Sequence, residues 1–272
     1  MTLLAITRGK ASPGATTAAT ALAAVWPTPV VLAECDPSGG DLALRLADEH
    51  GRPLARDRGL VSLAPAVREG GTADRLTEHV QTVAGGLPVL VGVESPAQAA
   101  AMSVSWPGLA HLFAGLRDVD VVCDCGLLAP AGPALPILAG ADLLVVLVRI
   151  SVAGLAHGRH TLAAADQLPG RRGRLIAVAV GGLAPAAPVE QLRGLLAGTG
   201  LAVDMVGWLP EDPAAGGLFA PWTRRLDRSH YLGAARELAG RLAVFTQPAF
   251  PAGPTDTAPV ARPAELASAG EG

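Results

Sequence analysis

The chain has 272 residues, 17% of them charged, and a formal net charge of −3 at pH 7. This balance argues against a dedicated nucleic-acid-binding protein, and the length suffices for one large α/β domain or two small ones. The three cysteines, Cys35, Cys123 and Cys125, show no disulfide or zinc-site spacing, and no apolar run approaches the roughly 20 residues that span a bilayer. With no signal-peptide pattern at the N-terminus either, a cytoplasmic protein is expected.

The first element is an apolar run, Leu3–Ile6, followed by a glycine-containing stretch and an alanine-rich segment, Ala18–Trp26. This order predicts a strand, a loop and a helix, the setting in which backbone N–H groups and a helix N-terminus bind phosphate. Gly9, Gly14 and Thr16 fit the G-x-x-x-x-G-K-[ST] spacing, with Ala15 in place of the lysine. The candidate phosphate ligands are Gly9, Lys10, Ser12, Gly14, Ala15, Thr16 and Thr17.

Lys10 is the only lysine, since the other 20 of the 21 Lys+Arg residues are arginine. Its position just after Gly9 resembles the ParA/MinD family of deviant-Walker P-loop ATPases, whose loop carries an early signature lysine. The resemblance implies that Lys10 reaches across a sandwich dimer to the partner's nucleotide and acts in catalysis. It also implies a degenerate member, because Ala15 stands where the family has its usual Walker lysine. A glycine- and proline-containing turn after an edge strand is the alternative.

The next apolar run, Thr28–Ala33, predicts a buried parallel strand that ends in Glu34 and Asp36. Carboxylates at this end of a strand lie where open α/β sheets bind ligands. The segment is similar to the D-x-D-P motif of the family, which implies that Asp36 is the catalytic, water-orienting aspartate. The alternative is that Asp36 caps a helix over Asp41–His50, for which Asp41 is the better cap.

Between this strand and the next acidic motif, the pattern predicts a short helix near Gly59–Leu63, a helix over Thr72–Ala84, a strand within Leu87–Glu94 and a long helix opened by Ser95-Pro96. The run Asp118–Asp124 then has the form of a Walker B strand. Asp124 is expected to hold Mg²⁺ together with the Thr16 hydroxyl. The family usually continues with x-Pro, whereas this chain has Cys125-Gly126.

Three further strands are expected within Ala141–Ile150, Arg174–Val180 and Val203–Leu209. Gly181 stands where ATP-using relatives often carry an adenine-reading asparagine. Pro210 and Asp212 match the family loop that folds over the base, which makes them candidate nucleotide contacts.

The C-terminal region carries Arg224, Arg225 and Arg228, a candidate surface for DNA of any sequence, because chromosome-partitioning relatives bind DNA through a basic C-terminal surface. Solvated arginines beside an amphipathic helix are the alternative. Residues 247–272 are rich in Pro, Ala, Thr, Gly and Ser and predict a disordered tail. The tail lacks the basic amphipathic helix of membrane-tethered relatives, so no direct membrane tether is expected.

Together the elements predict one α/β domain, residues 1–246, with a doubly wound, mainly parallel sheet and helices on both faces. The resemblance implies binding of ATP or ADP with Mg²⁺, a homodimer, and a role in positioning or regulating a chromosome, septum or pilus assembly through a protein partner. Loss of the Walker lysine predicts slow or absent hydrolysis. Two alternatives remain: a nucleotide-free scaffold, favoured if the Gly9–Thr17 loop is collapsed or disordered and no nucleotide shifts the melting temperature, and a non-specific DNA-binding partitioning protein.

Overall fold

The computed structural model describes residues 1–272 apart from 13, 71–74, 213–214, 216, 218–228 and 246–272. Its centre is an eight-stranded sheet of order β3-β4-β2-β5-β1-β6-β7-β8, in which β3 alone runs antiparallel to its neighbour. The strands are β1 (Leu3–Arg8), β2 (Val30–Glu34), β3 (Gln81–Thr82), β4 (Pro88–Leu90), β5 (Asp120–Leu127), β6 (Leu143–Arg149), β7 (Arg174–Val180) and β8 (Met205–Leu209).

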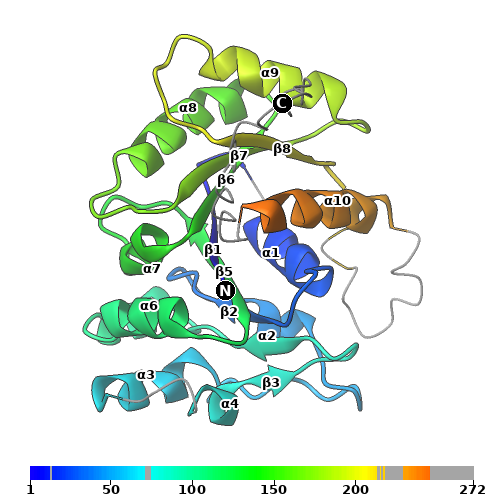
Figure 1. Cartoon of the computed structure of the whole chain (residues 1–272). Coiled ribbons are helices and arrows are strands. Elements are labelled where there is room, and N and C mark those ends of the chain that lie inside the picture. The colour runs from blue at the N-terminus through cyan, green and yellow to red at the C-terminus, as the bar shows by residue number, and fades with distance from the viewer. Residues whose placement is uncertain (13, 71–74, 213–214, 216, 218–228, 246–272) are drawn as a thin grey trace, which may run out of the picture.

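Helices cover both faces of the sheet, with α1 and α10 on one side and α6, α7 and α8 on the other (Figure 1). The helices in the described ranges are α1 (Ala15–Ala24), α2 (Leu42–Arg45), α3 (Leu60–Arg68), α4 (Leu76–His79), α5 (Pro96–Ala101), α6 (Trp106–Gly115), α7 (Leu135–Gly140), α8 (Val152–Asp166), α9 (Ala186–Leu196) and α10 (His230–Val244). The predicted doubly wound, mainly parallel α/β fold is therefore confirmed. The predicted tail and Arg224, Arg225 and Arg228 lie outside the described residues.

The core lies between the sheet and its two helical layers. Strands β1 and β6 are buried along almost their whole length, as expected for central parallel strands covered on both faces. Helix α1 packs on this sheet through Ala18, Ala19, Ala21 and Leu22, all fully buried. Small side chains let this helix lie close to the strands, and its N-terminus is thereby fixed at the end of β1.

Two of the expected helices are wrong. The segment expected as one helix over Thr72–Ala84 instead contains the four-residue α4 and the strand β3, which pairs with β4. The long helix expected after Ser95 is divided into α5 and α6, and a proline stands in the first turn of α6, where it fits a new helix better than the interior of an old one. The Ser95 cap itself is confirmed, since its hydroxyl accepts a hydrogen bond from the Gln98 N–H at 3.3 Å.

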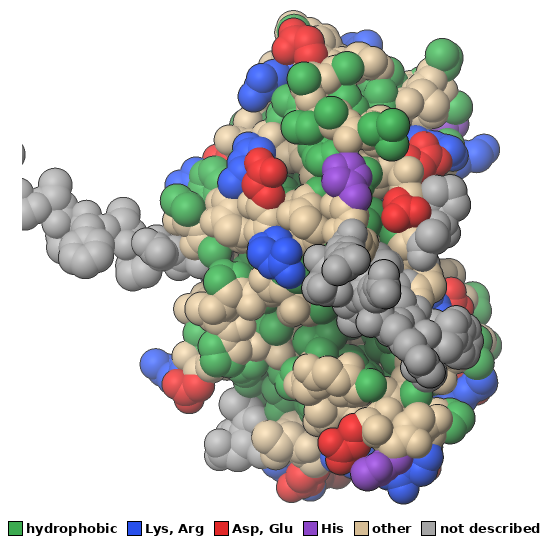
Figure 2. Space-filling model, turned by 90° about the vertical axis from the view of Figure 1, so that its right-hand side faces the viewer, with side chains coloured by type: hydrophobic (Ala, Val, Ile, Leu, Met, Phe, Trp, Pro, Cys, Tyr) green, Lys and Arg blue, Asp and Glu red, His purple; other side chains and the backbone are tan. Residues whose placement is uncertain are grey.

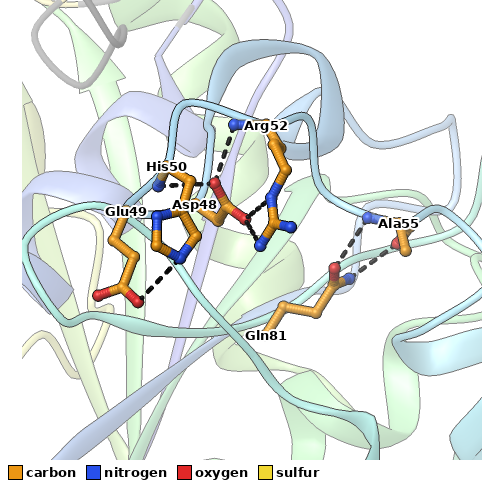
Figure 3. A network of polar contacts seen from close by, with 6 residues as sticks. All are labelled: Asp48, Glu49, His50, Arg52, Ala55 and Gln81. Carbon is orange, nitrogen blue, oxygen red and sulfur yellow. Dashed lines mark hydrogen bonds and ion pairs between the residues drawn. The ribbon is translucent and has the colours of Figure 1, made fainter.

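The helix expected over Asp41–His50 is also shorter, because α2 spans only Leu42–Arg45. A polar network organises the chain that follows (Figure 3). Asp48 accepts hydrogen bonds from the N–H groups of His50 and Arg52 and forms a 2.7 Å ion pair with the Arg52 guanidinium. The Arg52 N–H is the main cause of a lowered Asp48 pKa. The network closes a turn where the sequence suggested more helix.

Of the helices in the described ranges, none combines the length and apolar character needed to cross a bilayer.

Candidate functional site

A cavity of 810 Å³ opens at the carboxyl ends of the strands, where β1 lies between β5 and β6. Its lining comes from the loop after β1, the first turn of α1, the segment after β2, helix α2 and the end of β6. Among the residues predicted from the sequence, those that line it are Ser12, Gly14, Ala15, Thr16, Thr17 and Asp36. The structure thus brings the first predicted loop and the β2 carboxylate to one cavity, in the place where open α/β sheets bind ligands.

The loop between β1 and α1 has the backbone of an anion site. Gly14 is the N-cap of α1 at φ +100°, a left-handed conformation that favours glycine, and it has no side chain to accept the first N–H groups of the helix. Ala11 also has a left-handed φ of +63°. The buried Ser12 hydroxyl accepts a hydrogen bond from the Arg149 N–H at 2.9 Å, which ties the loop to β6. The first turn of α1 therefore presents its positive end to the cavity.

Gly9 and Lys10 do not line this cavity. Gly9 is buried against α8, and a Cβ at this position would overlap the Thr161 hydroxyl, so packing against α8 favours a glycine here. Lys10 is exposed.

Asp124 lies behind the loop, at full burial. Its Oδ1 accepts a hydrogen bond from the Gly126 N–H at 3.1 Å, whereas Oδ2 is buried without a hydrogen-bond partner among the described residues. Burial raises the pKa of Asp124 to about 6, although the Thr16 hydroxyl has the opposite effect and lowers it. A buried carboxylate oxygen without a donor, beside a threonine hydroxyl, fits a hard cation such as Mg²⁺.

Asp36 stands at the end of β2, partly exposed, and its Oδ1 accepts hydrogen bonds from the Ser38 N–H at 2.8 Å and the Ser38 hydroxyl at 2.6 Å. Its carboxylate also lies against Gly126, where an added Cβ would overlap it. This contact gives a physical reason for the glycine that follows Asp124-Cys125 in this chain.

Helix α2 is capped by a residue from another element. Glu34 is 1% exposed, and its Oε1 accepts hydrogen bonds from the N–H groups of Asp41 at 2.6 Å and Leu42 at 2.8 Å. Its Oε2 accepts one from the Gly92 N–H at 2.9 Å, just beyond β4. Asp41 is the N-cap residue, as the alternative reading of this segment expected, but its side chain makes no capping hydrogen bond. Burial raises the pKa of Glu34 to about 7, although these N–H groups lower it.

Three arginines that the sequence did not single out line the cavity: Arg8, Arg45 and Arg149. The Arg45 guanidinium donates a hydrogen bond to the Thr17 hydroxyl at 3.3 Å. Arg149 forms an ion pair with Glu211, in the segment after β8. Arg8 immediately precedes Gly9, the first glycine of the loop. This adjacency is the one local signal in the sequence that an arginine lies near the phosphate-binding loop.

Pro210 and Asp212 follow β8 and are not among the residues that line the cavity. Pro210 is buried. Nearby, the Trp208 indole N–H donates to the Gly181 carbonyl at 2.7 Å, and Gly181 has a φ of +150°. The ends of β7 and β8 are thus held together at the place where a base was expected.

No protein-family model matches the chain, and no curated protein matches it. Solved structures do. A ParA family ATPase from Chlorobium tepidum TLS is 15% identical with a TM-score of 0.63, over 87% of this chain and 98% of that one. The septum site-determining protein MinD from Pyrococcus horikoshii OT3, complexed with Mg-ADP, is 13% identical with a TM-score of 0.64, over 88% of this chain and 94% of that one.

A third structure, the cell division ATPase MinD from Pyrococcus furiosus, is 16% identical with a TM-score of 0.62, over 90% of this chain and 99% of that one. At sequence identities this low, the similarity to these structures establishes the fold alone. The chain has the P-loop NTPase fold of the ParA and MinD ATPases over nearly its whole described length.

Proposed function

We propose that the chain is a ParA/MinD-like protein that binds ATP or ADP with Mg²⁺, hydrolyses ATP slowly or not at all, and positions or regulates a partner assembly in the cytoplasm. The observation that carries this proposal is the cavity at the end of β1, where the open first turn of α1 meets Asp36. A helix N-terminus favours phosphate through its N–H groups and its dipole. The complex of the MinD neighbour with Mg-ADP supports the choice of ligand.

Thr16 and Asp124 would hold the metal ion. Thr16 lies in the first turn of α1 and Asp124 in β5, close enough for the Thr16 hydroxyl to affect the Asp124 carboxyl. The Asp124 Oδ2 has no donor among the described residues. When bound, Mg²⁺ would neutralise phosphate charge and orient the phosphates. Asp36 would orient the attacking water, since its carboxylate lines the cavity and is held by Ser38.

Slow turnover follows from Ala15. Its methyl group is 2% exposed and lines the cavity, so no side-chain charge enters from this position. A preorganised charge that stabilises the transition state contributes several kcal/mol in phosphoryl-transfer sites, and its loss lowers the rate by orders of magnitude. The exposed Lys10 is the candidate to act on a second subunit.

Two alternatives are less well supported. A nucleotide-free scaffold would be favoured by a collapsed or disordered loop and by a melting temperature that no nucleotide shifts, whereas the described part of this loop borders an 810 Å³ cavity. A DNA-binding surface at Arg224, Arg225 and Arg228 lies outside the described residues. On the face drawn in Figure 2, described Lys and Arg side chains are interspersed with Asp and Glu.

The proposal is tested by incubating the purified chain with Mg-ATP, isolating the complex and measuring how much of the bound nucleotide remains ATP. We expect nucleotide at up to one per chain, mostly still ATP after many minutes. The Asp36→Ala variant should retain binding. Absence of bound nucleotide would refute the proposed ligand, and fast turnover that Asp36→Ala abolishes would refute the weak hydrolysis.

A further inference from the structure

Two arginines from different elements line the cavity. Arg8 ends β1 and is partly buried, and Arg45 ends α2 and is also partly buried. Both line the cavity that Ala15 also lines. The chain therefore brings two guanidinium groups to the cavity in which Ala15 replaces a lysine.

Arg45 lies beside the N-terminus of α1. Its guanidinium donates to the Thr17 hydroxyl at 3.3 Å, so it lies beside the first turn of α1. A cation at a helix N-terminus is opposed by the positive end of the helix dipole, and each such contact is unfavourable by a few tenths of a kcal/mol to about 1 kcal/mol. An anion between the guanidinium and the helix reverses the sign of both interactions.

Arg8 is the second positive group. Within the described part of the chain it forms no ion pair, although its charge is near enough to Asp124 to lower the pKa of that carboxyl. Arg8 and Arg45 are chosen by position, because both line the cavity, Arg8 at the end of β1 and Arg45 beside Thr17 in the first turn of α1.

We propose that Arg8 and Arg45 bind the phosphate groups of the ligand and replace, within one subunit, the lysine that Ala15 removed. The inference rests on the proposed nucleotide site and deepens it by naming the side chains that hold the phosphates. Guanidinium groups suit this role, since they offer forked donors to phosphate oxygens and keep their charge at all physiological pH values. Neither group lies in the loop itself, so the phosphate site is assembled from β1, α1 and α2.

The test is the dissociation constant of Mg-ADP and of inorganic pyrophosphate with Mg²⁺, measured by calorimetry. Arg8→Gln and Arg45→Gln should each weaken both ligands at least about tenfold, as expected for loss of one charge-assisted hydrogen bond. Arg8→Lys and Arg45→Lys keep the charge and should recover part of the loss. Ala15→Lys should restore binding to Arg45→Gln. The control is Arg159→Gln, which removes an exposed arginine on α8 that does not line the cavity.

The outcomes separate the two proposals. If wild type binds Mg-ADP and both glutamine variants bind it as tightly as Arg159→Gln, the arginine assignment is wrong and the nucleotide site stands. If wild type binds neither ligand and Ala15→Lys binds both, the arginines do not replace the lysine and the proposed function fails with them. Circular dichroism of each variant establishes that loss of binding occurs in folded protein.

Discussion

Gly126 shows how one residue shapes the site. It has a φ of +60°, a conformation that costs side-chain-bearing residues about 1 kcal/mol or more, and an added Cβ would overlap the Asp36 carboxylate. Its N–H holds Asp124 Oδ1, and its carbonyl accepts a hydrogen bond from the Thr7 hydroxyl at 3.0 Å. One glycine therefore links both predicted carboxylates with the end of β1.

We predict that Gly126→Ala lowers the free energy of unfolding by about 1–3 kcal/mol and displaces Asp36, so that stabilisation by Mg-ADP is reduced or lost. Urea denaturation with and without Mg-ADP measures both effects. The matched control is Gly194→Ala, on the exposed side of α9, where a Cβ would meet no atom within 4 Å. This control should be neutral or stabilise by about 0.5–1 kcal/mol. Equal behaviour of the two variants would contradict the role given to Gly126.

At the scale of elements, Glu34 joins β2, α2 and the end of β4 through a buried carboxyl. Its pKa is about 7 in the folded chain and 4.5 as an ordinary carboxyl. Between these values the folded state binds a proton that the unfolded state has released, so stability falls as pH rises through this window. Asp124, with a pKa of about 6, acts in the same direction at lower pH.

We therefore predict that the titration of Glu34 alone removes about 2–3 kcal/mol of unfolding free energy from the metal-free chain between pH 4.5 and pH 7.5. Glu34→Gln should be less stable overall, because its amide would face the Gly92 N–H, but its pH dependence should be much flatter. Urea denaturation in EDTA across this pH range provides the measurement. A variant with the slope of wild type would show that Glu34 is not the titrating group.

Signals confined to neighbouring residues made much of this site predictable. An apolar run followed by glycines located β1, its loop and α1, and acids that follow apolar runs located Asp36 and Asp124, although β5 continues past Asp124 to Leu127. Arg8 and Arg45 were missed because they line one cavity only in the folded chain, where Arg45 of α2 lies beside Thr17 of α1. The sequence offers Asp41 as a cap candidate but cannot show the Glu34 cap, which is a contact between elements. It predicts helix before Ala84 because β3 exists only by pairing with β4.

At the scale of the whole molecule, exposed apolar side chains lie just after the carboxyl ends of β6 and β7. Val152, which begins α8, is 90% exposed, and Leu183, which follows β7, is 85% exposed. Both follow neighbouring parallel strands at one edge of the sheet, which makes them candidates for a contact with another chain. Together with the exposed Lys10, they support a proposed dimer that closes over this edge of the sheet.

We predict that Mg-ATP shifts the chain from monomer toward dimer and that Val152→Asp and Leu183→Asp each weaken this dimer by about tenfold or more, because a carboxylate would be buried in the contact. Sedimentation velocity over a range of protein concentrations measures the effect. The control is Val244→Asp, which changes an exposed apolar residue at the end of α10. A chain that stays monomeric with Mg-ATP at high concentration would contradict the proposed dimer.

The most direct test of the central claim, that this cavity binds nucleotide without its loop lysine, is the thermal stability of wild type and Ala15→Lys with and without Mg-ADP. A ligand at ~100 times its dissociation constant stabilises a protein by ~2.7 kcal/mol, which raises the Tm of a domain of this size by several degrees. We predict such a rise for wild type and a larger one for Ala15→Lys. A rise in Ala15→Lys alone would contradict the account, because the cavity would then have lost its ligand together with its lysine.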